Sequence, residues 1–450
     1  MESDINEQRF NDLFQTSLEE IKAIIKVPSF SNGEVNEQYP YGKNVHQVLE
    51  DVIDLGKKLG FKTKLAIQNR YGYIEYGSGK ELIGILCHLD VVPPGDLSKW
   101  EFPPFEPTIK NDILYGRGVI DDKGPAIINL FALKYLVDEG FIPQKRIRLI
   151  FGITEETTWD SIQHYMNNEE KPKFAYTPDG YFPLVYAEKT ILNLKIIEKN
   201  PQQDFTINGG AAYNVTCDQA EYRGSQLETL ITVLEQNKFL YKKQDNKVIV
   251  LGKAAHGSKP QEGINAGLQL AMALATINND SKLVMWIAQQ LRLDPNAINI
   301  FTNIEDESGK LTLNVGFIEM NSKTNFIGCD FRIPVHTDVN VILKKLEASL
   351  APYNLVIEQV DLKEKLFFDK NSLIVKKLLN VYQQATNDMS QPLAIGGGTY
   401  ARSMENCVAF GAIFDSNTST EHQYNEQVLI SDLKKAMKIY IQAIIALDSI

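Results

Sequence analysis

Side chains able to bind a metal follow several short apolar segments of this 450-residue chain. His88 comes directly after apolar residues 82–87, and Asp90 lies two positions further on. Because side chains two residues apart in an extended chain point to the same side, Asp90 can orient an imidazole that binds a metal. The alternative for His88 alone is an ordinary local hydrogen bond at the end of a strand.

Three further groups of carboxylates have comparable settings. Asp121 and Asp122 end a glycine-flanked loop before an apolar helix, while adjacent Glu155 and Glu156, and then Asp179, follow apolar segments. A helix N-cap would explain the two aspartates equally well. Adjacent glutamates after a buried strand are harder to explain as solvated surface. One can bind a metal ion while its neighbour takes a proton from water.

A fifth group near the end of the chain contributes His422, one of six histidines. Borderline divalent cations prefer imidazole and carboxylate ligands, and hydrolytic two-metal sites need about five of them, one of which bridges the ions. Each group alone has a structural explanation. Together they supply enough ligands for two ions.

The first part of the chain has the alternating pattern that would bring these side chains together. Residues 82–87, 146–153 and 174–177 have the character of buried strands, and residues 124–139 that of a buried helix that ends before Gly140. Such alternation favours an α/β fold with a mostly parallel sheet and flanking helices. Ligands bind such sheets at the carboxyl ends of the strands.

The middle of the chain has a different pattern, richer in alternating strands. We interpret residues 190–384 as an inserted α+β domain, and residues 1–189 and 385–450 as the catalytic domain. The strands predicted in the insertion are residues 192–198, 215–222, 247–252, 311–317 and 326–333.

Composition argues against several classes of function. The net charge is −11 and the sequence pI is about 5.2, whereas nucleic-acid binding usually needs a basic surface. The longest apolar runs are too short to cross a membrane. The chain starts without the basic and apolar regions of an export signal, and its four cysteines are widely spaced. We therefore expect a cytoplasmic protein that binds neither nucleic acid nor membrane.

The motifs in combination resemble those of the ArgE/DapE-type co-catalytic zinc metallopeptidases and, within that family, the PepV-type bacterial dipeptidases. The resemblance covers nearly the whole chain. It rests on His88-Leu-Asp-Val-Val-Pro, Gly116-Arg-Gly-Val-Ile-Asp-Asp-Lys-Gly, Thr154-Glu-Glu-Thr, Pro178-Asp, Ile395-Gly-Gly-Gly-Thr-Tyr and Glu421-His-Gln.

The resemblance implies a site with two divalent metal ions, zinc in the first instance and manganese or cobalt as alternatives. It makes His88 and Asp179 ligands of one ion, Glu156 and His422 ligands of the other, and Asp121 the bridging carboxylate. Glu155 would be the general base on a water held between the ions, and Asp90 would orient His88. The family also implies a cis peptide bond between Asp121 and Asp122.

The inserted domain resembles the lid of this family. By that resemblance Asn214, His256, Arg332 and Gly397 bind the substrate: His256 at the tetrahedral intermediate, Arg332 at a carboxylate. The expected substrate is a small peptide, most specifically a dipeptide, and the protein would be a monomer or a homodimer. Cys87 departs from the family, which usually has glycine at this position.

Two rival functions follow from the same residues. An N-acyl amino-acid deacylase would use the same metals and base to hydrolyse another amide. A catalytically silent, metal-dependent peptide binder would use the metal ligands to bind a peptide without hydrolysing it. A nucleotide-binding Rossmann enzyme is disfavoured, because no G-x-G-x-x-G or P-loop pattern is present.

Overall fold

The computed structural model describes residues 5–31, 35–277, 281–415 and 418–450, and it divides into two compact units. Residues 1–4, part of the segment expected to carry no export signal, lie outside the described residues. Unit 1 comprises Met1–Tyr186, Phe368–Leu393 and Thr399–Ile450, and unit 2 comprises Ala187–Phe367 and Ala394–Gly398. Residues 368–384 thus belong with unit 1 rather than with the insertion, because the helix they enter packs against the last helix of the chain.

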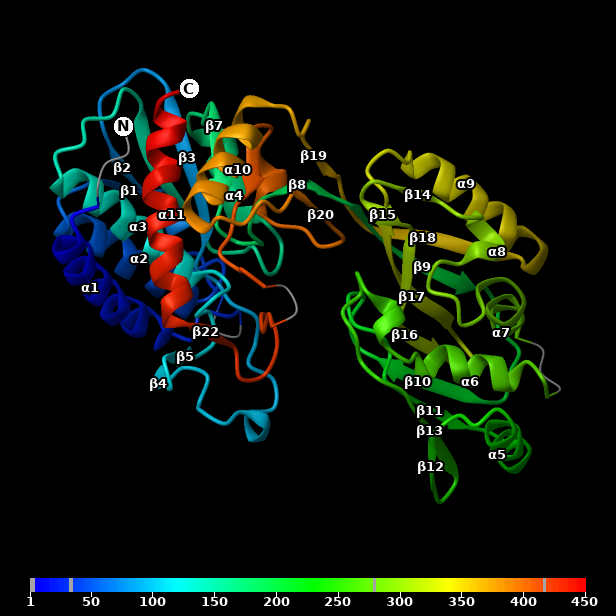
Figure 1. Cartoon of the computed structure of the whole chain (residues 1–450). Helices are drawn as coiled ribbons and strands as arrows, with labels where there is room; N and C mark the ends of the chain where they lie inside the picture. The colour runs from blue at the N-terminus through cyan, green and yellow to red at the C-terminus, as the bar shows by residue number, and fades with distance from the viewer. Residues whose placement is uncertain (1–4, 32–34, 278–280, 416–417) are drawn as a thin grey trace. The chain divides into compact units, whose positions relative to one another are not determined.

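Most strands of a nine-stranded sheet belong to unit 1 and form its centre (Figure 1). Strand β3 pairs in parallel with β6 and β7, and β21 pairs in parallel with β7, whereas the outer strands are antiparallel. The order is β1 (Lys62–Leu65), β2 (Gly72–Tyr76), β6 (Arg146–Gly152), β3 (Leu82–His88), β7 (Phe174–Thr177), β21 (Cys407–Ala409), β8 (Val185–Glu188) and β19 (Leu366–Phe367), with β20 (Leu393–Ile395) paired to β8.

The parallel centre confirms the predicted α/β fold. All seven residues of β3 are buried, as expected of a parallel strand covered on both faces. The predicted strands 82–87, 146–153 and 174–177 correspond to β3, β6 and β7 within one residue. These strands run in the same direction, so their carboxyl ends meet at one edge.

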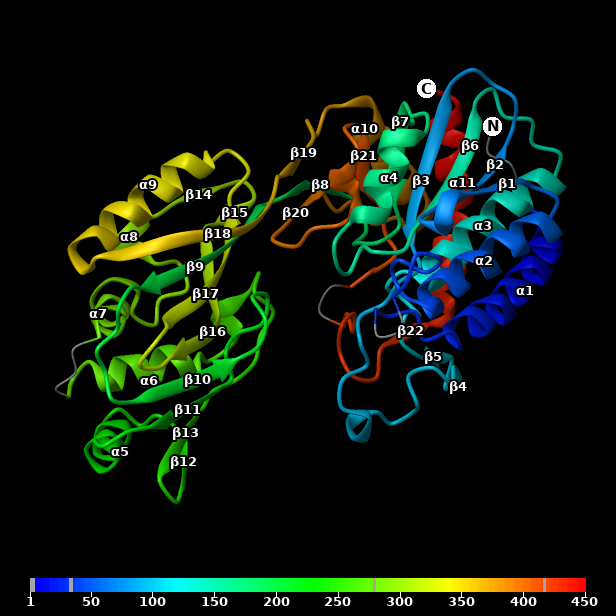
Figure 2. The same cartoon turned by 180° about the vertical axis from the view of Figure 1, so that it is seen from behind.

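Helices pack on this sheet and on one another. Helix α3 contacts both α1 and α11, and α11 contacts α10. In Figure 1, α11 lies in front of the sheet, and the reverse view in Figure 2 places β3 and β6 in front of α11. The helices of unit 1 are α1 (Glu7–Ile25), α2 (Lys43–Lys58), α3 (Lys123–Asp138), α4 (Asp160–Asn168), α10 (Leu373–Thr386) and α11 (Ile430–Asp448).

A small antiparallel sheet joins two loops of unit 1 that are distant in sequence. Its order is β22 (Gln427–Leu429), β5 (Ile113–Tyr115) and β4 (Thr108–Lys110). Strand β5 precedes the loop that carries Asp121, and β22 follows the segment that carries His422. The pairing therefore brings these two segments together.

Unit 2 is an eight-stranded antiparallel sheet covered by helices, which agrees with the predicted α+β character. Helix α6 contacts four of its strands, and α9 contacts the edge strand β18. The strand order is β12 (Tyr241–Gln244), β13 (Lys247–Leu251), β11 (Gln219–Arg223), β10 (Thr206–Gly210), β16 (Thr312–Met320), β17 (Asn325–Ile333), β9 (Thr190–Glu198) and β18 (Leu355–Lys363); the main helices are α5 (Leu227–Gln236), α6 (Ala266–Leu274) and α9 (Val339–Leu350).

One strand predicted in unit 2 is too long. Strand β11 begins at Gln219, not at Val215. Val215 instead makes an isolated bridge with His256. The apolar residues at 215–217 mimic a strand in sequence, but Thr216 donates its backbone N–H to Ala255, outside the sheet.

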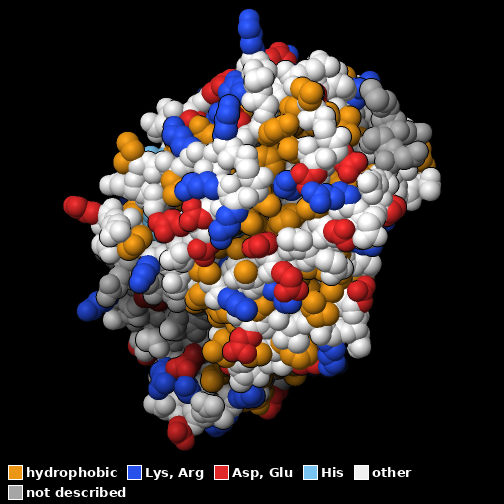
Figure 3. Space-filling view, turned by 90° about the vertical axis from the view of Figure 1, so that its left-hand side faces the viewer, with side chains coloured by type: hydrophobic (Ala, Val, Ile, Leu, Met, Phe, Trp, Pro, Cys, Tyr) orange, Lys and Arg blue, Asp and Glu red, His pale blue; other side chains and the backbone are white. Residues whose placement is uncertain are grey.

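The surface has mixed charge on the face drawn in Figure 3, where acidic and basic side chains are interspersed with apolar ones. In the described part of the chain, none of the helices combines the length and apolar character that crossing a membrane requires.

Candidate metal centre

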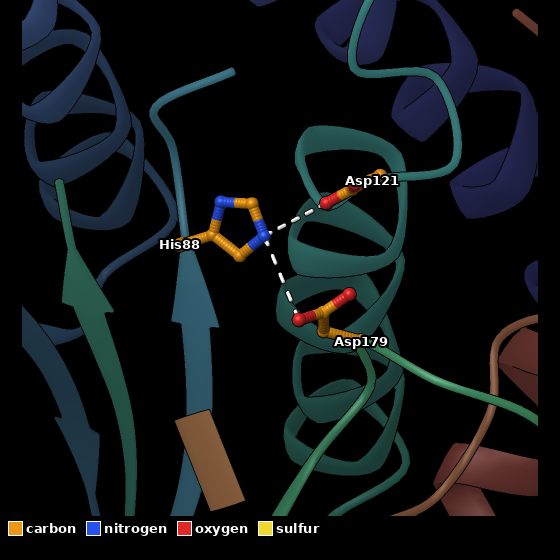
Figure 4. A group of neighbouring side chains, drawn as sticks. All are labelled: His88, Asp121 and Asp179. Carbon is orange, nitrogen blue, oxygen red and sulfur yellow. Dashed lines mark ion pairs between the residues drawn. The ribbon is translucent and has the colours of Figure 1, made fainter. Parts of the chain in front are cut away.

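His88 lies at the carboxyl end of β3 and points between two carboxylates (Figure 4). Its Nε2 is 2.9 Å from Oδ1 of Asp121 and 3.7 Å from Oδ2 of Asp179. The side chain is 1% exposed, and Nε2 has no hydrogen-bond partner with suitable geometry among the described residues. A buried nitrogen aimed between carboxylates in this way is typical of a metal ligand.

The orientation of His88 comes from the backbone of Asp90. Nδ1 of His88 is 2.9 Å from the backbone oxygen of Asp90, whereas the nearest carboxylate oxygen of Asp90 is 3.6 Å away. The carboxylate instead accepts the backbone N–H groups of Glu155 and Glu156, at 3.1 and 3.0 Å. Asp90 therefore connects the end of β3 to the two glutamates that follow β6.

Asp121 lies between the two histidines. Its Oδ1 faces Nε2 of His88, and its Oδ2 is 2.9 Å from Nε2 of His422. The peptide bond between Asp121 and Asp122 is cis, as the family resemblance implies. Asp122 occupies the N-cap position of α3 without capping it; its Oδ2 accepts the backbone N–H of His88 at 3.1 Å.

His422 completes the second half of the site. Its Nε2 is 3.1 Å from Oε1 of Glu156, in addition to its contact with Asp121. Its φ of 62° lies in the left-handed region, which is uncommon for a residue other than glycine and is concentrated at functional sites.

Among the described residues of unit 1, three groups of side chains have donor atoms within 4.8 Å of one another. The groups are His88 with Asp121 and Asp179, His88 with Glu155 and Glu156, and Asp121 with Glu156 and His422. The structure thus brings together all five predicted ligands and the predicted base.

The electrostatics of this cluster suit cations. Burial, and next the charge of Asp121, raise the pKa of Asp179 well above its usual value. The same two causes raise the pKa of Glu156. Burial also tends to raise the pKa of Asp121, but the contacts with His422 and His88 have the larger effect and lower it. Carboxylates this close repel one another when ionised, so imidazole and carboxylate donors here fit divalent ions such as zinc.

A cavity of about 530 Å³ in unit 1 adjoins these residues. Asp90 and Glu156 form part of its wall, together with Tyr41, Val91 and Thr157. Pockets for small ligands usually have volumes of about 300–1,000 Å³, so the cavity has room for a small molecule beside the carboxylates.

Two residues of this region were not predicted from the sequence. Tyr400 packs edge-on against His88, with ring centroids 6.0 Å apart, and Glu426 bonds to the loop that carries Asp121. Tyr400 ends the motif Ile395-Gly-Gly-Gly-Thr-Tyr, which implies no role for it. Glu426 lies four positions after His422 and belongs to none of the motifs. Cys87, flagged as a departure, is fully buried, and burial raises the pKa of its thiol, so it is a packing residue.

The four predicted substrate residues belong to a second cluster, in unit 2. The Arg332 side chain donates to both oxygens of Asp330, at 2.9 and 2.8 Å, and to the backbone oxygen of Gly396 at 2.8 Å. The residue is 4% exposed. The loop of Gly397 is thereby attached to β17.

The other two substrate residues are adjacent to each other in this unit. The backbone oxygen of Asn214 accepts the N–H of Gly257 at 2.7 Å, and Nδ1 of His256 lies 2.7 Å from Oγ of Ser258. A Cβ on Gly396 would lie 3.0 Å from that of Ser258, so the His256 loop and the glycine loop are neighbours.

Comparison with known proteins decides the family. Residues 84–446 match peptidase family M20/M25/M40. The chain belongs to this family. A Staphylococcus aureus (strain USA300) protein named "Putative dipeptidase" is 32% identical over 467 residues, covering 98% of each chain. The family identity makes the chain a metal-dependent peptidase.

Solved structures of this family share the fold. The M20 metallo-carboxypeptidase Sso-CP2 of Sulfolobus solfataricus aligns with a TM-score of 0.60 at 18% identity, covering 96% of this chain and 99% of that one. Human carnosine dipeptidase 1 aligns with a TM-score of 0.62 at 13% identity, covering all of both chains. At these identities the M20 structures support the fold alone.

Proposed function

We propose that this M20 peptidase is a dipeptidase that works with two divalent cations, zinc in the first instance. The observation that carries the proposal is the position of Asp121, whose two oxygens face two different histidines, each at 2.9 Å. A carboxylate that presents one oxygen to each of two ligand sets is suited to bridging two ions.

The remaining ligands divide between the two positions. We assign His88 and Asp179 to one ion, and Glu156 and His422 to the other. The donor atoms of each set lie within 4.8 Å of one another together with Asp121. When bound, the ions would polarise the scissile carbonyl and make water acidic enough to act as a nucleophile near neutral pH.

Glu155 is the proposed general base. Its carboxylate is in a group with His88 and Glu156, and Asp90 fixes its backbone through the N–H of Glu155. Glu155 would take a proton from the attacking water and pass it to the leaving amine as the C–N bond breaks. Proton transfer of this kind contributes about 10²–10⁴-fold to rate.

We assign substrate binding to the cluster in unit 2. Asp330 and Gly396 fix the guanidinium of Arg332 and leave one N–H on each of Nη1 and Nη2, to which we assign the carboxylate of the peptide. Exposed His256 would donate a hydrogen bond to the developing oxyanion, and Asn214 and Gly397 would contact the peptide. Capture of both ends of the peptide would favour dipeptides over longer chains, in line with the name of the Staphylococcus aureus relative.

The test is a substrate panel of dipeptides, tetrapeptides and acetylated amino acids, with zinc-, manganese- or cobalt-loaded protein. We expect fastest release of amino acids from dipeptides, and a rise of KM by about tenfold or more in Arg332→Lys, which loses the fork. Faster hydrolysis of acetylated amino acids would support a deacylase instead. Metal binding without any hydrolysis would support a silent binder.

A further inference from the structure

A buried carboxylate outside the ligand set holds the loop that ends at Asp121. Glu426 is 0% exposed. Its Oε1 accepts the backbone N–H groups of Gly118, Ile120 and Asp121, at 3.0, 3.2 and 3.4 Å. Its Oε2 accepts Nη1 of Arg117 at 2.7 Å. One side chain therefore takes four donors from a five-residue stretch.

The ion pair with Arg117 is itself buried. The Arg117 side chain is 2% exposed, and its guanidinium lies over the ring of Trp100, 5.1 Å from the centroid. Removing two charges from water carries a large desolvation cost, so a buried ion pair is weak evidence for stability. A role in fixing geometry explains this pair better, because all the hydrogen bonds of the Glu426 side chain converge on one loop.

The same residue attaches this loop to the segment of His422. The backbone oxygen of Glu426 accepts the N–H of Gly116 at 3.0 Å, next to the pairing of β22 with β5. His422 lies four residues before Glu426, and its Nε2 is 2.9 Å from Oδ2 of Asp121. The separation of these two side chains thus depends on contacts made by Glu426.

The neighbours of Glu426 anchor the segment on its other side. The side chain of Asn425 accepts the backbone N–H of Glu101 and donates to the backbone oxygen of Lys99. Tyr424 packs edge-on against Trp100, with centroids 6.4 Å apart. The segment is therefore fixed by the protein itself, independently of any ion.

We propose that Glu426 is a positioning residue for the metal centre, which holds Asp121 and His422 at the separation that lets one carboxylate serve two ions. The inference rests on the proposed function insofar as Asp121 and His422 are taken as ligands. It adds a residue that contacts neither the substrate nor the ions, and it predicts an effect on metal binding that can be measured without any substrate.

The experiment compares Glu426→Gln with a matched control, Glu75→Gln. Glu75 of β2 also pairs with a buried arginine, accepting Nε and Nη2 of Arg148 at 2.8 and 2.6 Å, but it lies on the sheet. Zinc stoichiometry by mass spectrometry and zinc affinity by chelator competition are measured for both. We expect the dissociation constant to rise about 10–100-fold in Glu426→Gln only, with kcat reduced and KM little changed.

A milder variant, Arg117→Lys, covers the case in which Glu426→Gln does not fold. It keeps the charge but loses the guanidinium that donates to Glu426 and lies over Trp100, and we expect zinc affinity to fall about threefold to tenfold, less than the full effect of losing such a contact. Zinc affinity in folded Glu426→Gln equal to that of Glu75→Gln would overturn the proposal. If Glu426→Gln does not fold, unchanged affinity in Arg117→Lys would overturn it. Normal zinc binding by the wild type without dipeptide hydrolysis would contradict the proposed function alone.

Discussion

The carboxylate of Asp90 holds the backbone of the two adjacent glutamates. One carboxylate oxygen accepts the backbone N–H of Glu155 and the other accepts that of Glu156. The backbone oxygen of Asp90 lies 2.9 Å from Nδ1 of His88. Asp90 is 3% exposed, so water cannot readily replace these contacts. The position of the proposed base therefore depends on a residue that does not react.

Replacing Asp90 by Asn tests this dependence. Asparagine offers one oxygen where the aspartate offers two, so one of the two half-buried N–H groups loses its acceptor. We expect kcat/KM for a dipeptide to fall about 10–100-fold. Asp96→Asn is the control, because Asp96 also accepts a backbone N–H, from Ser98, but on an exposed loop. Equal activity of the two variants would contradict the assigned role.

Sequence alone predicted the types of residue at the site better than their contacts. His88, Glu156 and Asp179 could be found because each follows an apolar strand, and parallel strands bring their carboxyl ends together. Glu426 could not be found in this way, because it follows no buried strand and its burial depends on a loop about 300 residues away in the chain. Spacing likewise could not distinguish the backbone oxygen of Asp90 from its carboxylate.

The first turn of helix α3 packs tightly against the loop that carries Asp121. Gly124 donates its N–H to Gly118 at 3.1 Å, and a Cβ at position 124 would lie 2.0 Å from the backbone oxygen of Val119. The loop that carries Asp121 can therefore close only over a residue without a side chain.

Gly124→Ala should displace this loop. We expect a loss of at least about 2–3 kcal/mol of unfolding free energy, because backbone must move to relieve the overlap, together with weaker zinc binding. Gly140→Ala, at the end of the same helix, has no atom within 4 Å of the added Cβ and a φ of 80°. It should cost about 1 kcal/mol and leave zinc binding unchanged. Denaturant unfolding measures the stability of both variants, and zinc titration measures their zinc affinity. Equal zinc affinity in the two variants would contradict the prediction.

Helix α2 contains a histidine that should make stability depend on pH. His46 is 0% exposed, and its ring stacks on Tyr41, with centroids 5.6 Å apart. Burial lowers its pKa from 6.5 to about 4. The unfolded chain therefore binds the proton more readily than the folded one, and stability falls as the pH drops from 6.5 towards 4.

His46→Gln should remove this part of the pH dependence, which amounts to at most about 3 kcal/mol. Unfolding free energies at pH 7 and pH 4.5 measure it for the wild type, for His46→Gln and for His336→Gln, which changes an exposed histidine. An equal loss of stability between these pH values in His46→Gln and in the wild type would contradict the role assigned to His46.

The predicted elements were most accurate where the strands are buried on both faces. Strand β3 is a nearly continuous apolar run, β6 is apolar apart from Arg146 and Arg148, and β7 is short and largely apolar, so their limits are visible in sequence. Residues 215–218 were wrongly included in a strand, because Val215 and Cys217 are apolar although Val215 donates its backbone N–H to Ala212 and the backbone oxygen of Cys217 accepts from Ala266, both outside the sheet. Residues 368–384 were placed in the insertion because the sequence of a helix such as α10 does not indicate which unit the helix packs against.

At the scale of the whole molecule, the metal centre should contribute to stability. Three carboxylates, Asp121, Glu156 and Asp179, lie close together in unit 1, and they repel one another without cations. Ions bound only by the folded protein stabilise it by about 2.7 kcal/mol at a hundredfold excess over the dissociation constant. We expect chelation to lower the melting temperature by about 5 °C and zinc to restore it. An unchanged melting temperature after complete removal of metal would argue against ligation by these residues.

We propose that the cluster around Asp121 binds metal and that Glu155 acts on water there to hydrolyse dipeptides. The first measurement is amino-acid release from a dipeptide panel by the purified protein, by chelated protein, by zinc- or manganese-restored protein and by Glu155→Gln. We predict that chelation abolishes hydrolysis, that metal restores it, and that Glu155→Gln retains both ions but loses about 10²–10⁴-fold in kcat. Hydrolysis that survives chelation, or a Glu155→Gln variant as active as the wild type, would contradict the account.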